Sequence, residues 1–308
     1  MRTLIWFSAL AMGLQACSQA PIDKANPTVQ ECNVGSYAQA DILALKAQKF
    51  AGLEEAAINQ IAFDMLPCLG HPDPAIRDGL VYESLSGFLR AEQITDATKL
   101  KMFDYVLSVL TGSAAEGSYN RPFAALDMSE LARADRVNAY LSDAQRDLLV
   151  QSTAQYMASI TDYRGFVDGE GWRHGVAHTA DLILQLSLNP KITDSQLHTL
   201  QTALATQIAP TSGHAYIHGE PERMARAVLY IANRGVILDE KWGTWFAKLA
   251  DPEPMAAWND VYKSEAGLAK LHNTKAFVSA IYINAAETKN ENIKALLAPA
   301  RAALIKLP

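Results

Sequence analysis

Two histidines and an aspartate recur at helical spacing in one stretch of the chain and form its most chemically suggestive pattern. His174, His178 and Asp181 follow the spacing His-x3-His-x2-Asp within a predicted helix over residues 171–188. At 100° per residue, these three side chains and Gln185 fall within about 60° of one another. The adjoining face of the helix is apolar, so the pattern predicts a polar stripe beside the hydrophobic core.

Three interpretations of this polar stripe are open. Two imidazoles and a carboxylate on consecutive turns suit a divalent metal such as zinc, with His214, His218 or water as a fourth ligand. Alternatively, Asp181 orients His178 as a general base for hydrolysis without a metal. In the third interpretation the stripe is structural, and its histidines bond to carbonyl groups and side chains of neighbouring helices. The H-E-x-x-H pattern of metalloproteases is absent, because Glu follows neither His174 nor His178.

Ionisable residues elsewhere are candidates for the walls of the same site. Several fall within residues 214–226, where Arg223 suits an anionic ligand. Glu222 and Arg226 stand at i and i+4, the spacing of a helical ion pair. The predicted ligand-binding residues, with Trp172 at the entrance, are Asp162, Arg164, Trp172, His214, His218, Glu222 and Arg223.

Helical periodicity recurs through most of the chain and predicts the elements that position these residues. No Asn-Gly or Asp-Gly turn is recognised between alternating strands. The expected helices cover residues 37–50, 54–68, 74–91, 96–111, 121–137, 142–160, 171–188, 194–208, 221–234, 239–249, 260–286 and 290–306. The short connections predict an all-α fold of stacked antiparallel helix pairs, HEAT-like or another α/α solenoid, in one domain over residues 37–308.

The first residues indicate an export signal rather than part of the fold. Arg2 precedes an uncharged, mostly apolar stretch that is shorter than the about 20 residues of a membrane-spanning helix. The stretch ends in LQAC at residues 14–17, which resembles the bacterial lipobox, so Cys17 is the predicted lipidation site. Residues 1–16 are then a lipoprotein signal peptide and residues 17–36 a flexible tether. An ordinary cleaved signal is the alternative.

The predicted export also bears on location and on the cysteines. Ser18 rather than Asp follows Cys17, which by resemblance to sorting rules in Gram-negative bacteria favours the periplasmic face of the outer membrane. The lipid anchor makes the membrane a predicted partner. In an oxidising periplasm Cys32 and Cys68 can form one disulfide, but the sequence leaves open whether they are bridged or free.

Composition restricts the other function classes. The chain has 308 residues, of which 49% are hydrophobic, and a formal net charge of −6. It has no basic run, and contact with phosphates needs a clustered positive field, so no nucleic-acid partner is expected. The P-loop of nucleotide-binding proteins and the G-x-S-x-G motif of serine hydrolases are also absent.

Four segments occur in order along the chain: GHPDPAIRDGLVYESL (70–85), SYNRPFAALDMSELARAD (118–135), TDYRGFVDGEGWRHGVAHTADLI (161–183) and HGEPERMARAV (218–228). Together they resemble the bacterial family called domain of unknown function 2785, over most of residues 50–235. The resemblance implies an all-helical domain and no particular reaction. Two residues depart from the family pattern. Arg173 stands where a small residue is expected, and Ile160 stands where an acid is usual.

Two functions from different classes follow from these observations. The first is an exported lipoprotein whose helical domain binds a protein or a small-molecule ligand, a role that suits the large surfaces of helical stacks. The alternative is a hydrolase, metal-assisted or not, with His174, His178 and Asp181 as catalytic residues. The sequence does not identify a cofactor, and a divalent metal such as zinc is one candidate.

Overall fold

The computed structural model describes residues 31–115, 117–237 and 239–308. Residues Glu31–Pro308 cluster as one unit. The predicted signal peptide, the predicted lipidation site Cys17 and residues 18–30 of the predicted tether lie outside the described residues. None of the described helices is long and apolar enough to cross a membrane.

Helices make up most of the described chain. In order they are α1 Gln39–Ala47, α2 Glu55–Asp64, the 3₁₀ turn η1 Leu66–Cys68, the π-helix η2 Ala75–Tyr82, α3 Glu83–Arg90, α4 Asp96–Thr111, α5 Asn120–Val137, α6 Asp143–Ser159, the strands β1 Phe166–Val167 and β2 Gly171–Trp172, α7 Gly175–Leu188, α8 Asp194–Ile208, α9 Glu220–Asn233, α10 Asp239–Leu249, the 3₁₀ turn η3 Trp258–Lys263, α11 Glu265–Glu287, α12 Glu291–Lys294 and α13 Leu297–Lys306. The predicted all-α fold of packed helix pairs is confirmed.

Several helices begin where the sequence predicts because a side chain satisfies their first backbone amides. Thr193 and Gln196 form a reciprocal capping box at the start of α8, and Ser142 and Gln145 do the same for α6. Thr95 accepts a hydrogen bond from a backbone amide in the first turn of α4. The ranges predicted for α4 and α8 therefore agree with the structure at both ends.

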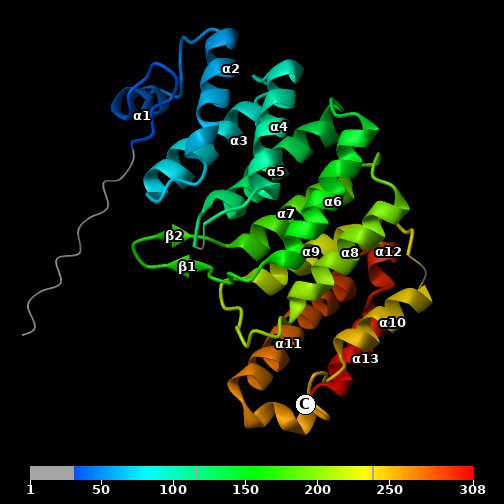
Figure 1. The fold of residues 1–308 in the computed structure, drawn as a ribbon. Coiled ribbons are helices and arrows are strands. Elements are labelled where there is room, and N and C mark those ends of the chain that lie inside the picture. Colours follow the sequence, from blue (N-terminus) through cyan, green and yellow to red (C-terminus); the bar gives the residue numbers. More distant parts are fainter. Residues whose placement is uncertain (1–30, 116, 238) are drawn as a thin grey trace, which may run out of the picture. The chain divides into compact units, whose positions relative to one another are not determined.

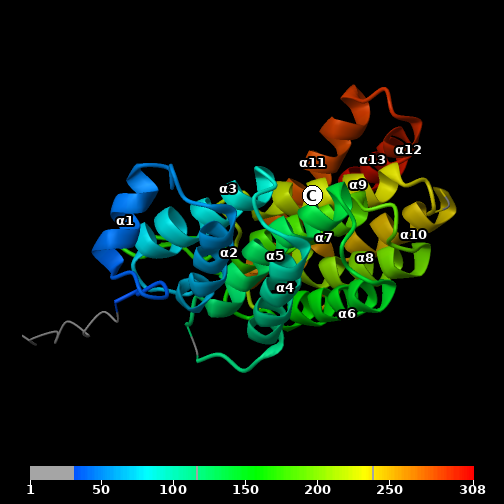
Figure 2. The same ribbon diagram turned by 90° about the horizontal axis from the view of Figure 1, so that it is seen from above.

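The helices stack in two layers (Figures 1 and 2). One layer consists of α2, α4, α6 and α8, and the other of α3, α5, α7, α9 and α11, with each helix packed against the next in its row. We call them the even-numbered and the odd-numbered layer. The two layers also pack on each other through α4 and α5, α6 and α7, and α8 and α9. After α9, helices α10 and α13 pack together and α13 also packs on α11.

Neighbouring helices of the odd-numbered layer run in the same direction, because their starts contact each other and so do their ends. Near the start of α5, the Phe123 ring packs edge-to-face on His178 near the start of α7, with ring centroids 5.2 Å apart. At the other end, Asn189 beyond α7 donates to Asp135 of α5, and Arg234 beyond α9 donates to the carbonyl of Asn189. The starts of α5, α7 and α9 therefore lie at one edge.

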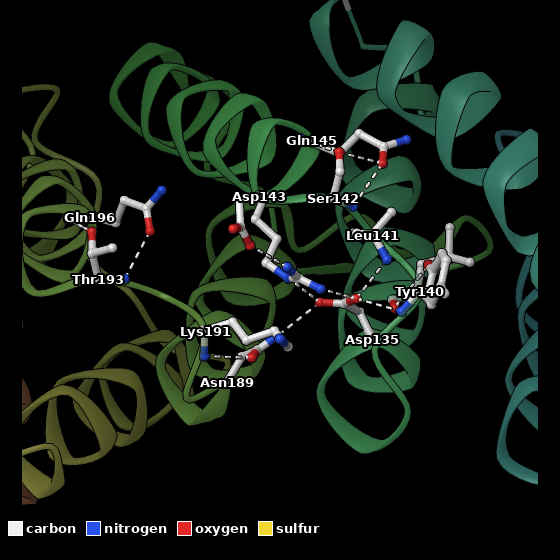
Figure 3. A network of polar contacts seen from close by, with 12 residues as sticks. Asp135, Tyr140, Leu141, Ser142, Asp143, Gln145, Asn189, Lys191, Thr193 and Gln196 are labelled. Carbon is white, nitrogen blue, oxygen red and sulfur yellow. Dashed lines mark hydrogen bonds and ion pairs between the residues drawn. The ribbon is translucent and has the colours of Figure 1, made fainter.

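A buried polar network joins the ends of α5 and α7 to the start of α6 (Figure 3). The carboxylate of Asp135 accepts hydrogen bonds from Arg146, Asn189 and the backbone amides of Tyr140 and Leu141. Burial alone would raise the pKa of Asp135, but these bonds, led by that from Arg146, lower it below its ordinary value. The network thus fixes the edge opposite the helix starts.

The structure corrects the predicted helix over residues 171–188. Helix α7 begins only at Gly175, and the residues before it form an antiparallel hairpin in which Phe166 pairs with Trp172. The turn contains Gly169, with φ +80°, and β2 begins at Gly171, with φ +77°; this backbone region favours glycine. The turn uses an Asp-Gly dipeptide at residues 168–169, a hairpin signal that is hard to recognise between strands of two residues.

The structure also corrects the end of the predicted tether. Cys32 and Val34 are buried in the core, and Val34 pairs with Tyr37 through two backbone hydrogen bonds. A disulfide joins Cys32 to Cys68, so the pairing that the sequence left open is present. Residues 32–36 therefore belong to the packed body.

Candidate functional site

The predicted site residues gather at the edge where the odd-numbered helices start. We define the N-terminal edge as the starts of η2, α5, α7 and α9 together with residues 160–174 and 209–219. Arg77 of η2 ties this edge together, since its guanidinium donates to the carbonyl of Glu170 and lies 4.0 Å from the centroid of the Tyr119 ring. A side chain at Gly171 would crowd this edge, because a Cβ would lie 3.0 Å from Pro74 and 3.1 Å from Arg77.

His174 precedes the first turn of α7 in the left-handed backbone conformation, with φ 51° and ψ 35°. This conformation is uncommon for a residue other than glycine and is typical of strained positions at functional sites. A hydrogen bond from its amide to the carbonyl of Arg164 holds it there. The imidazole stacks on the Trp172 indole, with centroids 4.6 Å apart and planes 20° apart.

The carboxylate that faces His174 is Glu220, the first residue of α9. Its Oε1 lies 3.3 Å from Nε2 of His174 and 3.9 Å from Nδ1 of His218, and its side chain is 2% exposed. Its Oε2 accepts a hydrogen bond from the backbone amide of His218. Burial alone would raise the pKa of Glu220, but the neighbouring His174 and backbone hydrogen bonds lower it below its ordinary value.

Glu220 is the site residue that sequence reasoning passed over in favour of Glu222. The signal for it is local: Gly219 has φ +86° and Pro221 occupies the first turn, so Glu220 marks the helix start. From that position its side chain points toward the neighbouring helix start, whereas Glu222 is exposed on another face of α9.

Several buried polar atoms around Glu220 lack a well-aligned hydrogen bond in the described part of the chain. They are Nε2 of His174, Nδ1 of His218, Oε1 of Glu220 and Nε2 of His214. Leaving a buried polar group unpaired costs about 1–3 kcal/mol. Such a cluster is consistent with a place where a ligand or water completes the hydrogen bonding.

His178 does not take the role predicted for it. Its Nδ1 lies 3.1 Å from the carbonyl oxygen of Pro122, and its side chain is buried. Burial, together with the nearby charges of His174 and Arg223, lowers the pKa of His178 to about 3, so the ring is neutral at physiological pH. Its position fits the structural interpretation, and the prediction that Asp181 orients it as a general base is wrong.

Asp181 is bound to Arg223 instead. The guanidinium Nε donates to one carboxylate oxygen at 2.7 Å, and Nη2 donates to the other. The predicted metal set of His174, His178 and Asp181 is therefore not assembled, and no group of three His, Cys, Asp or Glu side chains among the described residues is placed to hold a metal ion. The same pair corrects the prediction that Arg223 is free for an anionic ligand.

The other charged residues predicted to line the site lie close by, but they form ion pairs with one another. Arg164 forms an ion pair with Asp162 at 2.6 Å. Arg173, the departure from the family pattern, turns away from His174: it pairs with Glu170 at 3.1 Å and lies over the Tyr119 ring. These charges are neutralised within the N-terminal edge.

Aromatic side chains cover the outside of this edge. Trp172 is 40% exposed and Phe166 44% exposed, and their rings meet edge-to-face at 5.1 Å. The ring of His214 stacks instead on Tyr163, with ring centroids 5.6 Å apart. Burial lowers the pKa of His214. On this outer surface the Trp172 ring stacks on His174 and lies 6.0 Å from the His218 ring.

A family model described as "Protein of unknown function (DUF2785)" matches residues 106–283, which include α5, α7, α9 and the hairpin before α7. No curated protein and no solved structure matches the chain.

Proposed function

The chain belongs to the family "Protein of unknown function (DUF2785)", whose description assigns no reaction, and we propose from the site geometry that the protein is an exported, lipid-anchored binding protein. Its ligand is a small ring-bearing amine that binds at the N-terminal edge. One observation carries this proposal: the buried carboxylate of Glu220 lies beside His174, which stacks on the exposed Trp172, and one of its oxygens lacks a well-aligned hydrogen bond.

The charge balance of the edge favours a cationic ligand. Asp162 and Glu170 each have an arginine partner, whereas Glu220 has only imidazoles beside it among the described residues. An ammonium group would supply the missing donor and neutralise the carboxylate in a place with little water. Hydrogen bonds to a charged group contribute about 1.5–3 kcal/mol, more than a neutral bond does.

The indole of Trp172 supplies the second half of the recognition. An exposed aromatic face of this kind binds the flat face of another ring and also attracts cations. Because His174 stacks on one side of the indole, its orientation is fixed before a ligand arrives. Preorganisation of this type lowers the entropic cost of binding.

Titration calorimetry with glucosamine and phenethylamine, two ring-bearing amines, tests the proposal, with glucose and phenethyl alcohol as neutral counterparts. We expect an amine to bind and its neutral counterpart to bind at least about tenfold more weakly. Glu220→Gln keeps the shape of the side chain, removes its charge and should abolish that difference. Equal binding of amine and alcohol, or unchanged binding by Glu220→Gln, would refute the proposal.

A hydrolase is the second candidate function. Its candidate catalytic residues are Glu220 and the imidazoles beside it, in place of His178 and Asp181. The favouring observation is that Glu220 lies between His174 and His218. Since Nδ1 of His218 faces the carboxylate, Nε2 is left to take a proton from water, and this side chain is 26% exposed. Hydrolysis of p-nitrophenyl acetate should then fall in His218→Gln and not in His198→Gln, which lies on α8.

The location of the protein is part of the same proposal. We infer that Cys17 carries the lipid and that the domain faces the periplasm from the outer membrane. The disulfide between Cys32 and Cys68 supports export, because such bonds persist in oxidising compartments and are rare in the bacterial cytosol.

A further inference from the structure

A cavity of about 560 Å³ is lined by residues of α9 and α11 together with Ile293 of α12. Its α9 wall is a helical stripe that includes Glu222, Arg226 and Tyr230, and its α11 wall includes Asn284 and Glu287. Volumes of about 300–1,000 Å³ are typical of small-molecule sites. We call this cavity the α9–α11 groove.

The α9–α11 groove is separate from the N-terminal edge. Glu220 and Glu222 are two residues apart on α9, so their side chains point about 200° apart around the helix axis. Glu220 is buried toward α7, whereas Glu222 is exposed in the groove. A ligand in one site therefore does not occupy the other.

The charged groups of the groove are not paired with each other. Arg223, one turn before Arg226, is held by Asp181, and its pKa is lowered by burial and by the charge of Arg226. Arg226 itself has no ion-pair partner in the described part of the chain, so the ion pair predicted with Glu222 is not formed. Glu287 likewise has no cationic partner among the residues described.

We propose that the α9–α11 groove binds a short peptide that carries a free carboxylate and a lysine. The planar guanidinium of Arg226 is suited to bind a carboxylate through two parallel hydrogen bonds. Glu222 and Glu287 provide acceptors for the ammonium group, and Leu229 with the ring of Tyr230 provides apolar surface between the charges. One cation and two anions in one groove match a ligand with the reverse charges.

Titration calorimetry with the tripeptide Lys-Leu-Ala tests this inference through a double-mutant cycle. Amidation of the peptide carboxylate and the substitution Arg226→Gln should each weaken binding by about tenfold. Applied together they should weaken it no further than either alone, because both remove the same contact. Acetylation of both peptide amines and the double substitution Glu222→Gln with Glu287→Gln form a second cycle. Each change should weaken binding, and the two together should weaken it no further than either alone.

Arg301→Gln is the matched control, because Arg301 is an exposed arginine on α13 outside the groove. It should leave the affinity for Lys-Leu-Ala unchanged. The inference is overturned if the wild-type protein gives no binding at millimolar peptide, or if the effects of amidation and of Arg226→Gln add independently. The amine assay at the N-terminal edge uses different residues and a different probe. A failure of that assay therefore leaves the test of the α9–α11 groove unaffected.

Discussion

Nε2 of His174 lies 3.3 Å from Oε1 of Glu220, although His174 directly precedes α7 and Glu220 begins α9. The contact exists because α7 and α9 run side by side in the same direction, which places their first residues at one edge. It also needs the left-handed backbone of His174, since a helical residue at that position would direct its ring elsewhere. Fold and local strain together therefore create the site.

The buried imidazole of His178 should make the protein sensitive to mild acid. Its pKa is about 3 in the folded chain and about 6.5 when unfolded, so the unfolded state binds more protons between these values. Stability is then lost as the pH falls below about 6.5. In His178→Gln, which does not titrate, the Tm should fall less between pH 7 and pH 5 than in the wild type.

Scanning calorimetry at pH 7, 6 and 5 measures this difference in slope. His198→Gln, a substitution of a half-buried histidine on α8, is the control and should follow the wild type. Parallel curves for His178→Gln and the wild type would show that His178 is not the responsible group.

Asp127 of α5 should act in the opposite direction. Both of its carboxylate oxygens are buried without a hydrogen-bond partner in the described part of the chain. Burial and the neighbouring Glu130 raise its pKa to about 8, compared with about 3.9 when unfolded. The folded state therefore binds more protons between these values, and stability falls as the pH rises from about 4 to about 8.

The substitution Asp127→Asn removes that titration while it keeps the size of the side chain. The Tm of the variant should rise relative to the wild type as the pH increases from 5 to 8. Asp104→Asn, at an exposed position of α4, should show no such trend. A constant difference between Asp127→Asn and the wild type over this range would contradict the prediction.

Local chemistry explains which parts of the fold the sequence predicts well. Helix α4 begins after Thr95 because this side chain caps a free amide, and the cap is readable from residue type alone. The hairpin before α7 was missed because its strands are two residues long, too short for alternation to be visible. Its turn signal, Gly169 after an aspartate, was present but had no strand pattern around it.

The site was harder to predict because it depends on contacts between helices. A helical wheel correctly groups His178 and Asp181 on one helix, but it cannot show that Asp181 meets Arg223 from α9. For the same reason Glu220 could not be matched with His174. The residue types were recognisable, whereas their partners followed only from the parallel stacking of α7 and α9.

Lipidation of Cys17 is the prediction that tests the location of the protein. Cells grown with an alkyne fatty acid should label the wild-type chain, and Cys17→Ala should lose the label, because the thiol is the attachment point. Fractionation should recover the wild-type protein with the outer membrane. Equal labelling of both chains, or recovery of the wild type in the soluble periplasm, would show that the signal is an ordinary cleaved one.

The disulfide between Cys32 and Cys68 should contribute directly to stability. It closes a loop with a sequence separation of 36 residues. Loops of this size are expected to contribute about 3–4 kcal/mol, mainly by restricting the unfolded chain. Urea unfolding with and without a phosphine reductant measures the effect. The double variant Cys32→Ser with Cys68→Ser should resemble the reduced wild type and be insensitive to reductant; an insensitive wild type would show that the bond does not stabilise the fold.

The polar network around Asp135 offers a prediction with its control built in. Arg146 contacts two aspartates: Asp135, whose side chain is 2% exposed, and Asp143, whose side chain is 94% exposed. Removing one partner of a buried ion pair leaves an uncompensated charge and costs about 3–5 kcal/mol, whereas an exposed pair is worth about 0–1 kcal/mol. Asp135→Ala should therefore lower the free energy of unfolding far more than Asp143→Ala.

Urea unfolding of the two variants measures this contrast directly. Asp135→Asn should fall between them, because it keeps an acceptor oxygen for Leu141 but removes the charge that Arg146 and Asn189 face. Acid adds a second readout. Since the pKa of Asp135 is lowered in the folded state, its contribution is present above the unfolded pKa and is lost as the pH falls through the folded one. The free energy of unfolding of the wild type should therefore exceed that of Asp135→Asn at neutral pH but not at low pH. A difference that persists at low pH would mean that packing, not charge, makes this residue important.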